Sequence, residues 1–152
     1  MMDRRFFILS ALALSACGRK SRQPQQSRDL YPGESQEIRV LINQYSSLYD
    51  VPAALIHRVV QRESGYNPAA RNGPYYGLMQ ILPQTAGTMG FRGNPSDLLD
   101  ADTNLKYAVK YLRGAWLLSN GNFDTAVKWY ASGYYYEAKR RGMLVETGLK
   151  AG

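Results

Sequence analysis

Apolar residues recur along the chain at intervals of three and four, the spacing that gathers them on one face of a helix. The first such stripe consists of Ile38, Leu41, Ile42, Tyr45 and Leu48. It predicts an amphipathic helix of about 12–15 residues. Strict alternation of apolar and polar residues, which is typical of a half-buried strand, is not sustained anywhere. The pattern therefore predicts a mainly α-helical fold.

A second helix is expected directly after the first. Asp50 is a candidate N-cap, and Pro52 is suited to a first helical turn. Gly65 marks the expected end of this helix. Residues 66–77 are rich in Gly, Pro, Asn and Tyr, which indicates a loop.

Three further helices are expected beyond this loop. Pro83 begins a short one. A longer one carries the apolar stripe of residues 105–116, with Asp102 or Thr103 as its N-cap. Asp124 would cap a last helix of one or two turns.

The first sixteen residues have the pattern of a signal peptide. Two arginines precede an apolar run from Phe6 to Ala16, which ends in small residues. The run is about half of the roughly 20 residues that a membrane-spanning helix needs. We therefore expect a signal peptide over residues 1–16, with a buried N-terminal helix as the alternative.

Positive charge is concentrated in the segment that follows. The formal net charge is +7, but residues 29–152 hold 13 basic and 11 acidic residues, or +2. The basic residues of the Gln- and Ser-rich stretch before them are Arg19, Lys20, Arg22 and Arg28. This composition predicts a flexible basic tether over residues 17–35, followed by one domain over 36–152. The low charge of that domain argues against a nucleic-acid-binding protein.

The chain holds one cysteine and one histidine. This excludes a disulfide framework and a thiolate metal cage, and we expect neither a metal nor a cofactor. The sequence Leu14-Ser15-Ala16-Cys17 resembles a bacterial lipoprotein signal, in which Cys17 becomes the lipidated first residue. Gly18 follows, as in lipoproteins of the outer membrane. The resemblance implies a lipid anchor at the periplasmic face of that membrane; an ordinary free thiol is the alternative.

Glu63 occupies an unusual place for a carboxylate. It follows Val59 by four positions and Ile56 by seven, so it continues the apolar stripe into the last turn of its helix. Burial and the negative end of the helix dipole both disfavour its charged form and would raise its pKa. A carboxyl group that stays protonated near neutral pH can act as a general acid. The alternatives are a side chain turned to solvent, or pairing with Arg58 or Arg62, which would lower the pKa.

A series of short motifs surrounds and follows this glutamate. They are Glu63-Ser64, Asn67-Pro68-Ala69-Ala70, Gly77-Leu78-Met79-Gln80-Ile81-Leu82-Pro83, Thr85-Ala86, Asn104-Leu105, Ala108 and Tyr111-Leu112. Their order and spacing resemble the catalytic domain of the bacterial soluble lytic transglycosylases and their lipoprotein relatives, over about residues 38–133. The resemblance implies a helical, goose-lysozyme-like fold with a groove for glycan strands. It also implies cleavage of peptidoglycan between N-acetylmuramic acid and N-acetylglucosamine, which leaves a 1,6-anhydromuramyl end.

The resemblance further implies roles for single residues. Glu63 matches the catalytic acid/base. Ser64, Gln80 and Leu82 are matched to substrate binding, and the amide of Gln80 can both donate to and accept from a sugar. Tyr130 would also contribute to the groove, with its hydroxyl directed toward Glu63 to hold it.

One motif departs from the family pattern. Relatives commonly have A-Y-N-A-G, whereas this chain has Tyr130-Ala131-Ser132-Gly133, so Ala131 replaces an asparagine. Asn72 lies near a position where relatives often have serine. The tyrosines at 134–136 are expected either to line the cleft or to form a packing or membrane-facing cluster.

The chemistry implied by the resemblance needs a single carboxylate. Glu63 would protonate the leaving oxygen and then accept the proton of the C6 hydroxyl as it attacks C1, with the substrate's N-acetyl group stabilising the cationic centre. The later acids Asp97, Asp100 and Asp102 have the spacing of turn and capping residues. The alternatives are a lysozyme-like hydrolase, which needs a second group, and a catalytically inactive peptidoglycan-binding lipoprotein. In each case we expect a monomer.

Overall fold

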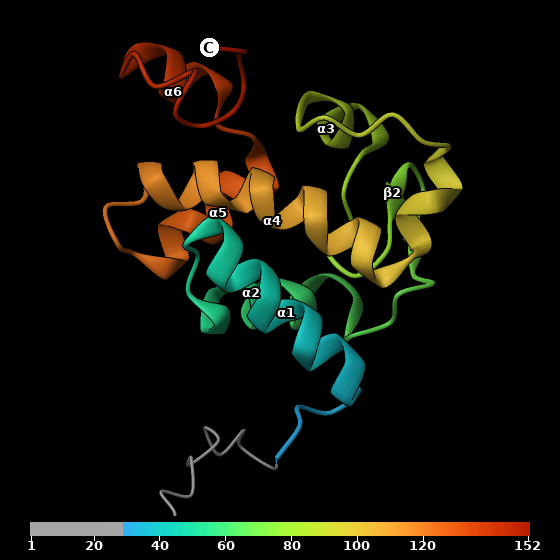
Figure 1. Ribbon diagram of the computed structural model, residues 1–152. Coiled ribbons are helices and arrows are strands. Elements are labelled where there is room, and N and C mark those ends of the chain that lie inside the picture. Colours follow the sequence, from blue (N-terminus) through green and yellow to red (C-terminus); the bar gives the residue numbers. More distant parts are fainter. Residues whose placement is uncertain (1–28) are drawn as a thin grey trace, which may run out of the picture.

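Six α-helices, one 3₁₀ helix and a small hairpin make up residues 29–152, the part that the computed structural model describes (Figure 1). In chain order these elements are α1 (Gln36–Tyr49), α2 (Ala53–Ser64), β1 (Arg71–Asn72), β2 (Tyr75–Tyr76), α3 (Pro83–Thr88), η1 (Pro95–Leu99), α4 (Ala101–Leu118), α5 (Phe123–Ser132) and α6 (Tyr135–Arg140). The predicted mainly helical class is confirmed. The expected signal peptide, Cys17 and the tether up to residue 28 lie outside the described residues.

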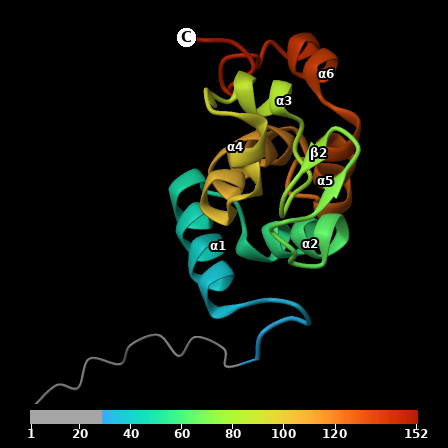
Figure 2. The same ribbon diagram turned by 90° about the vertical axis from the view of Figure 1, so that its right-hand side faces the viewer.

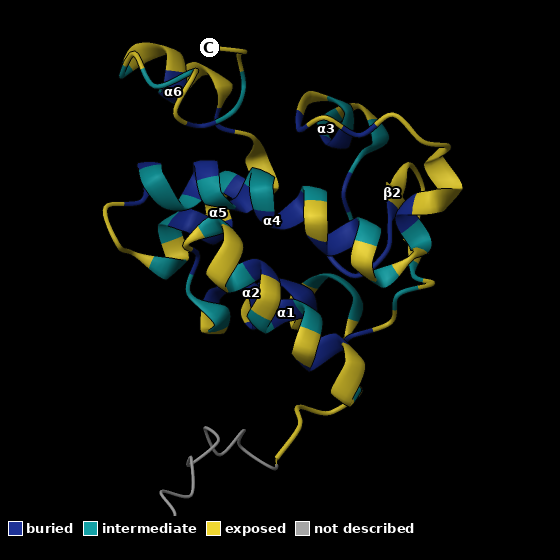
Figure 3. Cartoon of the chain, in the orientation of Figure 1, coloured by how far each residue is buried: buried dark blue, intermediate teal, exposed yellow. Residues whose placement is uncertain are grey.

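The core is built around α4, which crosses the middle of the domain (Figure 1). It packs against α1 on one side and α5 on another (Figure 2), and it also contacts η1 and α3. The predicted stripe on this helix is confirmed: Leu105, Ala108, Val109 and Leu112 are fully buried, and Trp116 is partly buried against the core. Figure 3 shows buried residues on the inward faces of the helices and exposed ones outside. Burial of this stripe therefore holds α4 in the core of the domain.

The junction between α1 and α2 differs from the expectation. Asp50 does not cap α2; it ends α1 in a left-handed conformation with φ 52°, and its N–H donates to the carbonyl of Ser46. Pro52 stands at the N-cap of α2 instead. Gly65 ends α2 with φ 58°, as its sequence position predicted.

Two other helix starts are shifted from their predicted positions. The N-cap of α4 is Asp100, whose carboxylate accepts a hydrogen bond from the N–H of Thr103 at 2.8 Å. The prediction of Asp102 or Thr103 was therefore wrong. The N-cap of α5 is Asn122 rather than Asp124.

The loop between α2 and α3 contains the hairpin, whose two strands pair Arg71 with Tyr76 and Asn72 with Tyr75. Strands of two residues are too short to produce an alternating pattern, so they were not predicted. Asn104 of α4 anchors the chain just beyond this hairpin. Its Nδ2 donates to the carbonyls of Tyr76 and Leu98, each at 2.8 Å, and its Oδ1 accepts from the N–H of Met79 at 3.0 Å.

The start of the domain lies earlier than the expected boundary at residue 36. The side chain of Glu34 is buried and accepts two hydrogen bonds from Arg39, each 2.5 Å long. Burial opposes ionisation of Glu34, but the hydrogen bonds from Arg39 and from the N–H of Tyr31 outweigh it, and its pKa is lowered. Gly33 packs against the carbonyl of Gly65 at the end of α2. This part of the expected tether therefore belongs to the fold.

Two glycines of the hairpin region provide a test of the Asn104 anchor. Gly73 and Gly77 both have positive φ, 57° and 72°, but only at Gly77 would a Cβ meet a neighbour: Asn104 Nδ2 and the Leu98 carbonyl, each at 2.3 Å. We expect Gly73→Ala to lower the free energy of unfolding by about 1 kcal/mol, the cost of the left-handed backbone. Gly77→Ala should cost about 3 kcal/mol, because overpacking adds to it. Urea unfolding of the full chain measures both; equal losses would contradict the anchor.

Candidate active site

Glu63 lies in the last turn of α2, at the edge of the core. Val59 and Val60 of the same helix are fully buried, whereas the Glu63 side chain remains 24% exposed. It lines a pocket of about 250 Å³, here called the Glu63 pocket. The residues around this pocket are Arg62, Glu63, Asn72, Tyr75, Gln80, Tyr130 and Ala131. The carboxyl group is thus half-buried but reachable from solvent.

The surroundings of Glu63 favour its protonated form. Burial raises its pKa above the ordinary value of 4.5, and the charge of Arg62 partly offsets this increase. The Nε of Arg62 lies 3.6 Å from Oε1 of Glu63. Arg58, the other arginine considered from the sequence, pairs with Asp124 instead. The predicted direction of the pKa shift is confirmed.

Ser64 points its hydroxyl at the protein backbone. The Oγ donates to the carbonyl of Leu78 at 2.8 Å and also lies 3.3 Å from the carbonyl of Val60. Ser64 is not among the residues that line the Glu63 pocket. This bond ties the end of α2 to the segment after the hairpin. A contact of Ser64 with substrate stays a prediction.

Gln80 contributes a hydrogen-bond acceptor to the pocket. Its Nε2 donates to the carbonyls of Ala70 at 3.1 Å and Gly77 at 2.9 Å, so both of its amide protons are used inside the protein. The backbone of Gln80 has φ 48°, an uncommon conformation for a residue with a side chain. The expectation that its amide both donates and accepts is corrected: only Oε1 remains for a ligand.

Tyr130 does not hold Glu63 in the way that was expected. Its hydroxyl donates to the carbonyl of Met79 at 2.8 Å. Burial raises the pKa of Tyr130, and the nearby charge of Glu63 raises it further. The two side chains are therefore neighbours, but the proton of the tyrosine satisfies a backbone carbonyl and fixes the position of the Met79–Gln80 segment.

A second pocket, of about 270 Å³, adjoins the first. It is lined by Tyr75, Gln80, Ile81, Leu82, Thr85, Tyr111, Tyr130, Ala131, Ser132 and Gly133. Four of these residues also line the Glu63 pocket, so the two pockets form one groove. Leu82 lies in the part of the groove beyond Gln80, where the sequence resemblance places a substrate contact. Tyr75, 42% exposed and shared by both pockets, was not predicted, because no motif surrounds it.

The three consecutive tyrosines after α5 do not act as one cluster. Tyr134 is buried, and its hydroxyl donates to the carbonyl of Tyr111 at 2.8 Å. Tyr136 is 83% exposed, and neither Tyr135 nor Tyr136 lines the groove. Tyr134 therefore packs in the core, which was one of the predicted alternatives, and none of the three tyrosines lines the groove.

Within residues 29–152, His, Cys, Asp and Glu side chains do not gather in any group of three or more that could hold a metal ion. No helix in this part of the chain has the length and apolar character needed to cross a membrane. Glu63 is the only acidic residue that lines the two pockets of the groove as described. The chemistry of this groove therefore has one carboxyl group available.

Comparison with known proteins identifies the family. Residues 40–142 match the family described as Transglycosylase SLT domain. The chain belongs to the SLT family. The fold of this SLT domain is lysozyme-like, as predicted.

The SLT domain is also similar to curated proteins. It is 38% identical over 88 residues to membrane-bound lytic murein transglycosylase C of Mannheimia succiniciproducens. The aligned region covers 53% of this chain and 24% of the relative. The protein of the same name from Haemophilus influenzae strain PittEE is 38% identical over 92 residues, or 55% of this chain and 25% of the relative. The match thus spans about a quarter of the length of these relatives. No solved structure matches the chain.

The balance of forces on Glu63 can be measured without any substrate. We expect a carbon-detected NMR titration to place the midpoint of its carboxyl group above 4.5, and the Arg62→Gln variant to move it higher, because the offsetting cation is removed. Arg58→Gln, one helical turn earlier, is the matched control and should leave the midpoint in place, since Arg58 is paired with Asp124. A midpoint that falls in Arg62→Gln would contradict this account.

Proposed function

We propose that this SLT domain cleaves the glycan strands of peptidoglycan by the lytic transglycosylase reaction, with Glu63 as the acid/base. The observation that carries the proposal is a single carboxyl group with a raised pKa in the groove of an SLT domain. The names of the relatives, lytic murein transglycosylases, support the same reaction. The bond cleaved is that between N-acetylmuramic acid and N-acetylglucosamine.

The reaction divides into two proton transfers through Glu63. In the first, the protonated carboxyl group donates to the glycosidic oxygen as the bond from that oxygen to C1 of the muramic acid breaks. The N-acetyl oxygen of the same sugar stabilises the positive charge that develops at C1. In the second, the Glu63 carboxylate accepts the proton of the C6 hydroxyl as that oxygen bonds to C1. The product is a 1,6-anhydro ring, no water is consumed, and Glu63 is again protonated.

An intramolecular nucleophile fits the groove better than a water molecule does. The C6 hydroxyl is already held near C1 by the sugar ring, so proximity supplies what a positioning residue would otherwise provide. A hydrolase commonly uses a second carboxylate about 5–9.5 Å from the first. Among the residues lining the groove, Glu63 alone is acidic. This favours the transglycosylase over the lysozyme-like alternative.

The other side chains of the groove have binding and positioning roles in this proposal. Gln80 Oε1 would accept a hydrogen bond from a sugar hydroxyl or amide, since its donors are occupied. Leu82 and the exposed ring of Tyr75 offer apolar surface for sugar faces. Tyr130 and Ser64 act indirectly, because their hydroxyls hold the Leu78–Met79 backbone beside Glu63.

The cellular setting is part of the same proposal. Residues 1–16 would act as a signal peptide, and a lipid on Cys17 would hold the domain as a monomer at the cell envelope, on the periplasmic face of the outer membrane. The curated relatives are named as membrane-bound, which supports an envelope location.

The decisive test uses purified peptidoglycan sacculi and mass spectrometry of the released fragments. We expect wild-type protein to release fragments lighter by one water than hydrolysis products. Glu63→Gln should lower the rate by about 10²–10⁴-fold, the usual contribution of a general acid. The exposed Glu146→Gln is the matched control and should leave the rate unchanged.

Each other outcome selects another function. Fragments with ordinary reducing ends would identify a hydrolase. Protein that pellets with sacculi but releases nothing would identify a binding module, and the next variant would be Ala131→Asn, which restores the residue common in relatives. Full activity in Glu63→Gln would overturn the assignment of the acid.

The raised pKa of Glu63 also fixes the pH dependence of the reaction. The first step needs the protonated carboxyl group, so kcat/KM should fall as pH rises through the pKa of the free enzyme. Arg62→Gln should move this alkaline limb to higher pH, because it raises that pKa. Measuring kcat/KM against pH on glycan strands without peptides tests this dependence. A decrease in kcat/KM that begins at lower pH in Arg62→Gln than in wild type would contradict it.

A further inference from the structure

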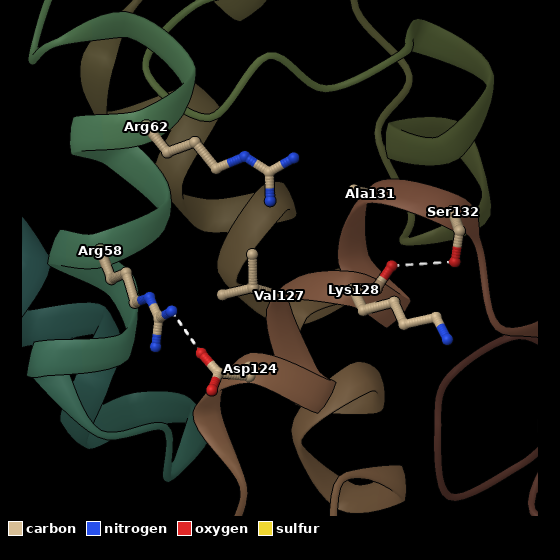
Figure 4. A pocket seen from close by; sticks show the side chains of 7 residues that line it. All are labelled: Arg58, Arg62, Asp124, Val127, Lys128, Ala131 and Ser132. Atoms are coloured by element: carbon tan, nitrogen blue, oxygen red, sulfur yellow. Dashed lines mark hydrogen bonds and ion pairs between the residues drawn. The ribbon is translucent and has the colours of Figure 1, made fainter.

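A third pocket, of about 450 Å³, opens between α2 and α5 beside the groove (Figure 4). We call it the basic pocket; its lining residues are Arg58, Arg62, Asp124, Val127, Lys128, Ala131 and Ser132. Arg62 and Ala131 also line the Glu63 pocket, so the two pockets adjoin. The proposed cleavage reaction uses none of its charged groups directly.

Helix geometry explains how these side chains come together. Arg58 and Arg62 are four residues apart and lie on one face of α2. Asp124, Val127 and Ala131 recur at intervals of three and four on the facing side of α5. Figure 4 shows both arginines extending from α2 toward α5. The pocket is therefore formed by two rigid helical faces rather than by loops.

The basic pocket holds unpaired positive charge. Three of its residues are cations, and its one acid, Asp124, pairs with Arg58. Arg62 pairs with the carboxylate of Glu63 through Nε at 3.6 Å. Figure 4 shows its guanidinium extending from α2 into the pocket. Lys128 has no acidic partner among the described residues, and its ammonium stands at the opposite rim. A free guanidinium is a strong, bidentate receptor for a carboxylate.

The surface below Arg62 is small and apolar. Val127 is 7% exposed, and Ala131 ends at its Cβ. The Arg62 side chain above it is 54% exposed, so solvent screens an ion pair formed there and limits its strength. The small apolar surface leaves room beside Glu63 for a group attached to the sugar bound there.

We propose that the basic pocket binds a carboxylate of the peptide that peptidoglycan carries on its muramic acid, with Arg62 as the main contact. This inference rests on the proposed function, because it takes the strand to lie with a muramic acid at Glu63. Sugar hydroxyls are neutral and need no excess of cations, whereas the peptides of peptidoglycan end in free carboxylates. The pocket thus makes this domain prefer strands that still carry their peptides.

The test compares two substrates made from one preparation of glycan strands. One keeps its peptides. The other has lost them to an amidase, and the lactyl carboxylate that this hydrolysis exposes has been converted to an amide. We expect wild-type protein to cleave the peptide-bearing strands with a kcat/KM about threefold higher, the scale of one solvent-exposed ion pair. In Arg62→Gln this ratio should approach one, and in Lys128→Gln it should decrease. Lys139→Gln removes the same charge from the exposed surface of α6 and should keep the wild-type ratio.

The ratio of kcat/KM for the two substrates reports on peptide binding in the basic pocket separately from the cleavage reaction. Cleavage of stripped strands by Arg62→Gln shows that the variant is folded and that the reaction persists. A wild-type ratio of one, or a ratio unchanged by both pocket substitutions, would overturn the inference while leaving the proposed function intact.

If wild-type protein cleaves neither substrate, the proposed function fails. Co-sedimentation of the protein with the two kinds of strand then tests whether the basic pocket binds the peptide. A preference for peptide-bearing strands that is lost in Arg62→Gln would support it. Equal binding to both would overturn it.

Discussion

The buried amide of Asn104 is the interaction on which the groove depends. Its two donors and its acceptor are all satisfied by backbone groups, and each of these would cost about 1–3 kcal/mol if left unpaired. The close approach is possible because Gly77 has no side chain. The N–H of Met79 is thereby fixed, its carbonyl receives the hydroxyl of Tyr130, and the next residue, Gln80, enters the groove. Through Asn104, α4 thus fixes the position of the groove wall that faces α2.

Several hydrogen-bond donors near Glu63 are already committed to the protein backbone. The hydroxyls of Ser64 and Tyr130 and the amide protons of Gln80 are all directed at backbone carbonyls. These bonds hold one wall of the groove in place before a substrate binds. This suits the proposed reaction, in which the protein would hold the sugar and deliver and recover one proton.

Features that repeat along one helix could be predicted from the sequence. Contacts between residues far apart in the chain could not. The apolar stripes gave the helices, and the place of Glu63 under one of them gave the direction of its pKa shift. The cap of α4 was missed because Asp100, Asp102 and Thr103 are all good capping residues within four positions, and spacing alone does not choose among them. The partner of Tyr130 is a carbonyl 51 residues away, and a backbone group leaves no signature in the sequence.

Arg62 connects the two halves of the site, because it faces both Glu63 and the basic pocket. While Arg62 is unpaired in that pocket, its charge lowers the pKa of Glu63 against the effect of burial. A carboxylate that binds to Arg62 cancels part of this charge at short range, so the pKa of Glu63 increases and the protonated acid becomes more populated. In the proposed function, the contact that would hold the peptide would therefore also favour the protonated form of Glu63 that begins cleavage. An electrostatic link of this kind needs no movement of the backbone, since the charges already lie on adjacent residues at the end of one helix.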